Sequence, residues 1–256
     1  MSRPTTASAE SMIRHLTRQE VEHFTEHGYV APIRVMTPSD AGQYRARVEE
    51  YVQHVDDAGT LRTKAHLHCP ALNELVRLPA ILDPITDLLG PDVLCRSSSV
   101  FLKEPGTPAH VAWHQDAAYW ELEPPDVASA WVALTDSTVA NGALQVLPGS
   151  HRGPLFTHGP TTDPANMLSR AQAILDPIDH TGAVPLVLAP GEMSIHHMRI
   201  AHRSEPNHSK CRRIGFAIRY VAAHVRKTGT RRDSAILVRG TDRYGNFDPE
   251  PPSRNA

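Results

Sequence analysis

Two histidines and one aspartate are spaced in a way that suits a non-haem iron site. His114 and Asp116 are separated by a single glutamine, and His202 follows much later in the chain. Imidazole and carboxylate suit Fe(II), and two histidines with one carboxylate hold the ion on one face and leave the opposite positions open. Because a chain with 16 histidines produces His-x-Asp triplets by chance, the choice of the third ligand decides how much the pair indicates.

Three histidines compete for that third position. His196 and His197 are adjacent, so on a strand only one of them can face the interior. We prefer His202, because Arg213 follows it by eleven residues at the start of an apolar stretch. A guanidinium inside a barrel at that point would hold a carboxylate through two parallel hydrogen bonds. We therefore predict His202 as the third ligand and the adjacent pair as residues that pack or hydrogen-bond near the iron.

The spacing of the first two ligands fits the end of a strand. Residues i and i+2 of a strand point to the same side, so His114 and Asp116 would both reach one ion. A closed set of thiolates would instead indicate structural zinc, and the cysteines of this chain have no such spacing. We therefore predict His114, Asp116 and His202 as the metal ligands and the catalytic residues.

Composition limits the kind of protein. At 256 residues the chain is long enough for one sizeable core. Its formal net charge is −2 with both signs interspersed, which argues against nucleic acid or an anionic membrane as a partner. No apolar run approaches the roughly 20 residues of a membrane helix, and the first ten residues lack the apolar segment of a signal peptide. Three scattered cysteines are typical of reduced thiols in a cytoplasmic protein. The sequence does not indicate the oligomeric state.

The first third of the chain predicts helices. Thr17 and Glu20 form a capping-box pattern, and Gly28 ends the helix that follows. A second helix begins near Thr37, with proline in its first turn. A third helical pattern runs over about 70–89, where apolar residues recur at helical spacing up to a Gly-Pro pair.

The texture then changes to short apolar or alternating runs separated by proline and glycine, which indicates an all-β sandwich or barrel. The predicted strands are 93–102, 127–134, 143–147, 184–188, 193–198 and 213–221. The fold class predicted is mainly β, in one domain. Its expected parts are N-terminal helices over about 17–90, a core over about 93–222, and a C-terminal tail over 223–256 that need not belong to the core. Residues 153–181 are expected to be a long irregular loop, a kind that often serves as a lid.

Several motifs together resemble the phytanoyl-CoA dioxygenase family, over nearly the whole chain as far as about Tyr220. Members of that family are Fe(II)- and 2-oxoglutarate-dependent oxygenases. The resemblance therefore implies a double-stranded β-helix (jelly-roll, cupin-like) core with flanking N-terminal α-helices, and Fe(II), 2-oxoglutarate and O2 as cofactor and cosubstrates. The motifs are His114-Gln115-Asp116, Trp131, Asn141-Gly142, Pro148-Gly149-Ser150-His151, Gly191-Glu192, His202-x-Ser204-x-x-Asn207 and Arg213.

The resemblance also implies roles for residues outside the metal triad. Arg213 would bind the distal carboxylate of 2-oxoglutarate with help from Ser204. Trp131 would line the cosubstrate pocket, and Lys64 would contact the cosubstrate from the N-terminal region. The alternatives are an ordinary core position for Trp131 and a solvated position for Lys64.

The carboxylate position bears on the reaction type. In related halogenases a small residue stands there and leaves a coordination place for chloride. Because Asp116 is present, the resemblance implies hydroxylation or another C–H oxidation, in which O2 converts 2-oxoglutarate to succinate and CO2. The implied substrate is a small polar metabolite or a natural-product intermediate.

Substrate contacts are predicted from position alone. Tyr119 and Trp120 closely follow the metal motif, Asn166 lies in the long loop, and Arg219 shares strand parity with Arg213 and could hold a substrate anion. Two other functions use the same residues differently. A jelly-roll isomerase or hydrolase would keep the metal triad without needing Arg213, and a non-catalytic small-molecule binding protein would need neither.

Overall fold

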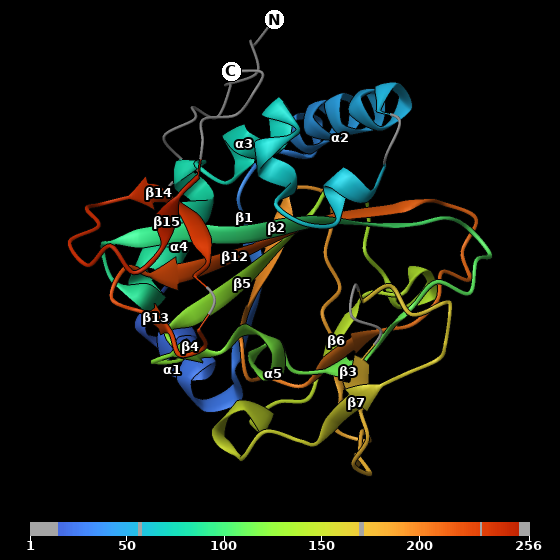
Figure 1. Cartoon of the computed structure of the whole chain (residues 1–256). Helices are drawn as coiled ribbons and strands as arrows, with labels where there is room; N and C mark the ends of the chain where they lie inside the picture. Colours follow the sequence, from blue (N-terminus) through green and yellow to red (C-terminus); the bar gives the residue numbers. More distant parts are fainter. Residues whose placement is uncertain (1–14, 56–57, 169–171, 231, 251–256) are drawn as a thin grey trace, which may run out of the picture.

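Two sheets form the core in the computed structural model, which describes residues 15–55, 58–168, 172–230 and 232–250 (Figure 1). The large sheet has the strand order β1-β10-β5-β12-β2-β14-β15, and the small sheet has the order β3-β11-β6-β9. Neighbouring strands are antiparallel except for the last pair of the large sheet. The strands of the large sheet are β1 (Tyr29–Arg34), β2 (Val93–Lys103), β5 (Val127–Ala133), β10 (Glu192–His197), β12 (Arg213–Ala222), β14 (Ser234–Arg239) and β15 (Asp248–Pro249).

The small sheet lies at the lower right of Figure 1. Its strands are β3 (Val111–His114), β6 (Leu144–Val146), β9 (Val184–Pro185) and β11 (His202–Ser204). Two further pairs are β4 (Leu122–Glu123) with β13 (Arg226–Lys227), and β7 (His158–Pro160) with β8 (Gln172–Ile174). The segment expected to be an irregular loop over 153–181 therefore contains a short two-stranded pair.

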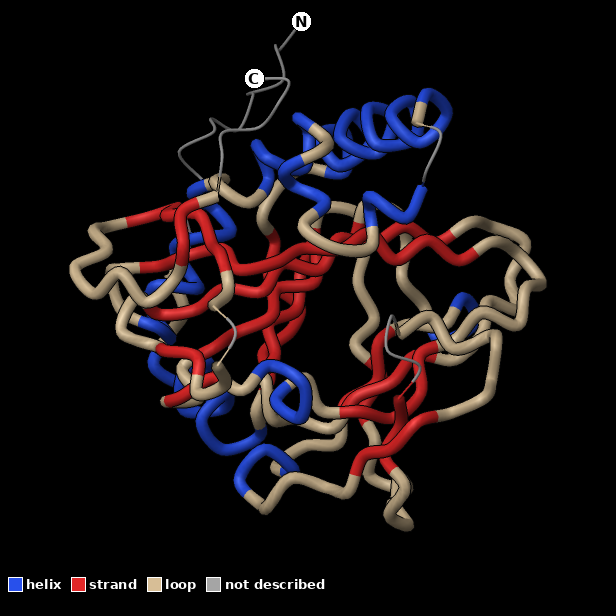
Figure 2. Tube along the Cα trace, in the orientation of Figure 1, coloured by secondary structure: helices blue, strands red, loops and turns tan. Residues whose placement is uncertain are grey.

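Helices cover the outer face of the large sheet (Figure 2). They are α1 (Arg18–His27), α2 (Pro38–His54), α3 (Pro70–Leu75) and α4 (Pro79–Leu89), with a short α5 (Ala117–Trp120) after the first metal motif. Single 3₁₀ turns occur at η2 (Ala58–Leu61), η3 (Ala65–Leu67), η4 (Val139–Asn141) and η5 (Ser150–Arg152). The first two helices begin at the capping boxes of Thr17 and Thr37, and α1 ends at left-handed Gly28, as predicted.

Strand β12 shows how the large sheet separates core from site. Ile214, Phe216, Ile218 and Tyr220 belong to the main hydrophobic cluster, which includes buried residues of the helices. Arg213 and Arg219 alternate with these residues and face the space between the two sheets, where both line a cavity. The same alternation on β5 puts Trp131 on the cavity side.

Two predictions about the elements are wrong. The helical pattern over 70–89 is broken into α3 and α4, because proline disfavours the helical conformation of the residue before it, and Leu78 before Pro79 is extended. The segment after 222 is not a tail outside the core: β14 pairs with β2, and Ile236 and Phe247 are buried.

Candidate metal and cosubstrate site

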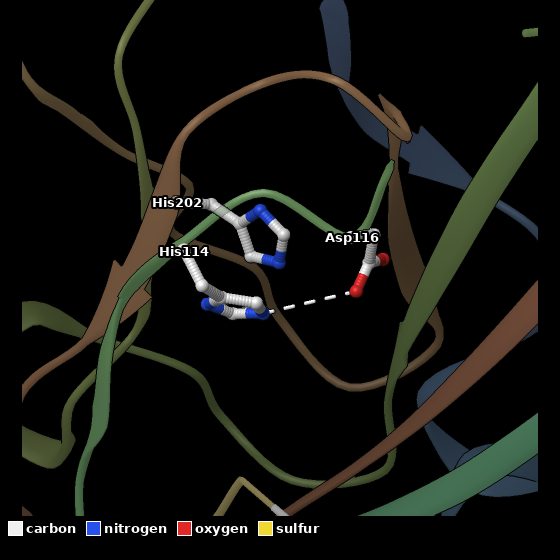
Figure 3. A group of neighbouring side chains, drawn as sticks. All are labelled: His114, Asp116 and His202. Atoms are coloured by element: carbon white, nitrogen blue, oxygen red, sulfur yellow. Dashed lines mark ion pairs between the residues drawn. The ribbon is translucent and has the colours of Figure 1, made fainter. Parts of the chain in front are cut away.

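The three predicted ligands meet where strands β3 and β11 of the small sheet approach the large sheet. His114 ends β3 and His202 begins β11, and these two residues are direct partners in the sheet. Their ring centroids are 4.0 Å apart, and His114 Nε2 lies 3.8 Å from Asp116 Oδ1. All three side chains are buried, and their candidate ligand atoms lie within 4.8 Å of one another. Figure 3 shows them converging on one space.

Asp116 does not lie on the same strand as His114, although its carboxylate reaches the same space. Strand β3 stops at His114, and Asp116 has a helical backbone (φ −55°, ψ −36°) as the residue that precedes α5. The chain therefore turns between the two ligands, and the turn carries the carboxylate toward the histidines. The expectation of two residues on one face of a strand is wrong in this detail.

Hydrogen bonds fix both imidazoles in the form that binds a metal. Nδ1 of His114 is 2.9 Å from the carbonyl oxygen of Ala112, and Nδ1 of His202 is 3.0 Å from that of Ile200. A carbonyl can only accept, so each Nδ1 carries the hydrogen and each Nε2 presents a lone pair. Burial lowers the pKa of both histidines, which keeps them neutral. This donor set fits Fe(II).

Neighbouring side chains hold the ligands in place. Ser129 Oγ donates to Asp116 Oδ2 at 3.3 Å, which leaves Oδ1 directed to His114. Gln115 points elsewhere: its amide donates to the carbonyl of Arg199 at 2.6 Å and accepts from the backbone of Phe156 at 2.9 Å. Such outer contacts orient ligands and tune their affinity for a metal.

Of the two adjacent histidines, only one faces the site. The ring of His196 is buried, lies 4.7 Å from the ring of His202 and borders the same cavity. The ring of His197 points to the other side of β10, toward Phe24. The predicted parity is confirmed.

The inner cavity adjoins the triad and contains a buried arginine. We use "inner cavity" for the space lined by Phe101, Val111, His114, Asp116, Ser129, Trp131, Leu144, His196, His202, Ser204, Arg213, Ala217 and Arg219. Arg213 is 1% exposed, donates to the carbonyl oxygen of Gly142, and stands 5.2 Å from the Trp131 ring centroid. Its Nε has no hydrogen-bond partner among the described residues. A buried guanidinium with a free donor is suited to hold a carboxylate.

Lys103, which the sequence analysis missed, adds a second buried basic side chain. It is fully buried, and its ammonium donates to the carbonyl oxygens of Ser204 and Glu205 and, at 2.7 Å, to Ser204 Oγ. Burial, together with the charge of Arg213, lowers the pKa of Lys103 to about 6. Because Ser204 Oγ accepts from Lys103, its own hydrogen is free to point into the inner cavity. No sequence pattern distinguishes this lysine from a solvated one.

A larger outer cavity of about 370 Å³ opens on the other side of the ligands. It is lined by Arg62, Thr63, Lys64, Arg96, Ser97, Ser99, His114, Asp116, Tyr119, Trp120, Leu168, Arg219 and Asp233. Of the four predicted substrate residues, Tyr119, Trp120 and Arg219 therefore border it. Arg219 lines both cavities, which places it beside the metal ligands.

Two predicted contacts have different positions. Lys64 lines the outer cavity and not the inner one, and its ammonium donates to Ser234 and Glu250. Asn166 lines neither cavity, because its Oδ1 accepts from the backbone of Ala112 and Leu168 and ties the loop to β3. Leu168 borders the outer cavity instead.

Comparison with known proteins decides the family. The profile of the family described as Phytanoyl-CoA dioxygenase (PhyH) matches residues 24–215, which is most of the chain. The chain belongs to this family. The cofactors expected from the sequence, Fe(II), 2-oxoglutarate and O2, are those of its alpha-ketoglutarate-dependent relatives, and the histidine and aspartate triad is present.

Relatives within and around the phytanoyl-CoA dioxygenase family are diverse. A probable alpha-ketoglutarate-dependent hypophosphite dioxygenase of Stutzerimonas stutzeri is 34% identical over 190 residues, which are 72% of this chain and 60% of that protein. The chain thus spans somewhat less than two thirds of the length of the first curated relatives it matches.

Solved structures confirm the jelly-roll fold. The apo form of the non-heme monooxygenase ThoJ has 37% identity and a TM-score of 0.80, covering 91% of this chain and 88% of ThoJ. The non-heme alpha ketoglutarate dependent carbocyclase SnoK from nogalamycin biosynthesis has 26% identity and a TM-score of 0.66, covering 90% and 91%. Among the residues of this chain that the structure describes, no helix is both long and apolar enough to cross a membrane.

Proposed function

We propose that this protein is an Fe(II)- and 2-oxoglutarate-dependent dioxygenase. It oxidises a C–H bond of a small polar metabolite or natural-product intermediate and releases succinate and CO2. The observation that supports this most is the juxtaposition of a buried metal-ligand triad with the buried guanidinium of Arg213, which has no carboxylate within 4.0 Å among the described residues.

Each part of the inner site has a task in this reaction. When bound, Fe(II) with 2-oxoglutarate and O2 supplies the oxidising chemistry. Arg213 pairs with the distal carboxylate of the cosubstrate, and the Ser204 hydroxyl adds a hydrogen bond. Trp131, which is 4% exposed and packs under the guanidinium, keeps water from that contact. Exclusion of water strengthens such charge pairing.

The substrate proposal is supported by cavity size and by relatives. The outer cavity, at about 370 Å³, matches pockets that take small molecules. The relatives named above include one that is named for hypophosphite and one from nogalamycin biosynthesis. A metal-dependent isomerase or hydrolase has no use for Arg213, so the buried arginine favours the oxygenase.

Succinate formation tests this proposal. Protein is loaded with Fe(II) without oxygen, mixed with 2-oxoglutarate and air, and succinate is quantified while small metabolites are added one at a time. We expect slow succinate release alone and faster release with the correct substrate. The matched control is His114→Ala, which should release none. Iron-bound, folded wild-type protein that forms no succinate in any mixture would contradict the proposal.

A further inference from the structure

We propose that the outer cavity binds a small organic oxyanion, a carboxylate, phosphonate or phosphate, whose charge is held by Arg219. The inference rests on the proposed function, because it names the class of substrate for the same site. It starts from the charge of the cavity wall. Four cationic side chains line the cavity, against the carboxylates of Asp116 and Asp233.

Two of the cations already have carboxylate partners. Arg96 Nε lies 2.6 Å from Asp233 Oδ2, and its guanidinium stacks over Trp120 with 5.1 Å to the ring centroid. Lys64 pairs with Glu250 and lies 3.9 Å from Asp233. These pairs offset the charges of Arg96 and Lys64 without a ligand, and Arg62, the fourth cation, is exposed to solvent.

Arg219 is different because its described contacts are with uncharged groups. Its Nη1 donates to Ser99 Oγ at 2.7 Å and lies 3.5 Å from the carbonyl oxygen of Ala217. The guanidinium stands 5.9 Å from the Phe101 ring centroid. No described carboxylate lies within the 4.0 Å of an ion pair. Because no described carboxylate pairs with it, the free face of this half-buried guanidinium is suited to an anionic ligand.

The nearest acid does not remove this need. Asp116 is close enough to favour the charged form of Arg219, but the proposed function commits that carboxylate to the metal. When bound, the ion would have its two positive charges offset by Asp116 and by one carboxylate of 2-oxoglutarate, and Arg213 would offset the other carboxylate. The positive charge of Arg219 then has no anionic partner.

Position and size define the ligand further. Arg219 lines both cavities together with His114 and Asp116, so an anion held there brings its neighbouring carbon atoms close to the metal. Tyr119 and Trp120 form an aromatic part of the same wall. The site therefore fits a compact molecule with an oxyanion at its inner end and an apolar or aromatic body.

Binding of matched probes tests this proposal. The probes are phenylacetate, benzylphosphonate and benzyl phosphate, with phenylacetamide as the uncharged counterpart. Titration calorimetry is performed anaerobically on protein loaded with Mn(II) and saturating 2-oxoglutarate, and is repeated on the metal-free Arg213→Met variant. We expect at least one oxyanion to bind about tenfold more tightly than the amide in the loaded protein, since tenfold corresponds to one well-formed charge contact. The same preference, reduced in size, should remain in the metal-free variant, where Asp116 is not committed to a metal. The three anions distinguish a carboxylate from a phosphorus oxyanion.

Variants assign that preference to one side chain. Arg219→Gln should abolish the preference for the oxyanion, whereas Arg96→Gln, a control on the same wall whose arginine is already paired, should keep most of it. Ser99→Ala removes the hydroxyl that fixes Arg219 Nη1 and should weaken oxyanion binding while leaving the amide unchanged. If circular dichroism shows that Arg219→Gln is unfolded, the affinities of Ser99→Ala for the oxyanion and the amide test the proposal in its place.

Three results would overturn the proposal. The first is equal affinity of the wild type for the anions and the amide, and the second is a preference for the oxyanion that survives in Arg219→Gln. The third is an Arg219→Gln variant that loses affinity for 2-oxoglutarate but keeps its preference for the oxyanion. Failure of the proposed function is distinguishable, because Mn(II) or 2-oxoglutarate would then not bind, while the oxyanion preference of the metal-free protein would persist.

Discussion

At the scale of single residues, the site is defined by how charge is buried. Arg213 lines the inner cavity and Lys103 lies buried behind Ser204, and the described residues offer both side chains neutral oxygens rather than carboxylates. A dianionic cosubstrate would supply the missing negative charge. The proposed binding of 2-oxoglutarate at Arg213 rests on this complementarity of charge.

Removing the guanidinium should be costly for cosubstrate binding. Truncating one partner of a buried, hydrogen-bonded charge pair costs about 2–5 kcal/mol, so Arg213→Met should raise the 2-oxoglutarate concentration required for half-maximal succinate formation by about thirtyfold or more. Arg212→Met is the matched control, because Arg212 is exposed and pairs with Glu49 and Glu104. Equal requirements in the two variants would mean that another residue holds the carboxylate.

Lys103 should couple cosubstrate binding to a proton. In the ligand-free protein its pKa is about 6, so at pH 8 it is mostly neutral. A carboxylate that arrives nearby favours the charged form and raises this pKa, so binding takes up a proton and weakens as the pH rises above about 6. Calorimetry at pH 8 in buffers of different ionisation enthalpy should show this uptake, and Lys103→Met should lose it. No buffer dependence in the wild type would contradict the assignment.

At the scale of elements, close packing of β12 against β5 positions the arginine. Gly215 lies two residues after Arg213, and an added Cβ would come within 1.8 Å of the Trp131 ring. Overpacking of this kind costs about 1–3 kcal/mol, so Gly215→Ala should lower the free energy of unfolding by that amount and weaken 2-oxoglutarate binding. Gly42→Ala, on helix α2 where a Cβ meets nothing within 4 Å, should instead stabilise the protein slightly. Denaturant unfolding of both variants measures this contrast, and a harmless Gly215→Ala would refute it.

Local signals account for which elements could be predicted. Capping boxes and C-terminal glycine caps depend on only a few adjacent residues, so α1 and α2 begin where the sequence indicates. Long apolar strands such as β2 and β12 were also recognisable. Strand β1 was missed because Pro32 interrupts its short apolar run, and it exists through pairing with the distant β10.

The site shows the same division between local and distant information. Its metal ligands carry a motif, and Arg213 has a fixed offset from His202, so they could be named in advance. Lys103, Ser129 and the true position of Lys64 depend on which strands become neighbours, and nothing in adjacent residues encodes that.

At the scale of the whole molecule, the C-terminal segment completes both the fold and the outer cavity. It adds β14 to the large sheet, and Asp233 and Glu250 pair with cations of the cavity wall. The segment after 222 is therefore part of the same core that carries the metal site.

Substitution of one buried aromatic residue tests this role. Phe247 is 5% exposed and packs in a cluster with Leu94, Leu122 and Val127. Phe247→Ala should destabilise the protein by about 3–5 kcal/mol, the usual cost for a buried phenylalanine. Tyr244→Ala, at a side chain that is 58% exposed, should change stability little. Thermal unfolding that does not separate the two variants would show that the segment contributes nothing to the core.

The most direct test of the whole account is metal binding by two histidine variants. Calorimetric titration with Mn(II) should give one site per chain in the wild type. Loss of a ligand in His202→Ala should weaken binding by more than the tenfold to hundredfold that removal of a neighbouring group typically costs, whereas His196→Ala should stay within about that range. Tight one-to-one binding that survives in His202→Ala but is lost in His196→Ala would contradict the triad of His114, Asp116 and His202.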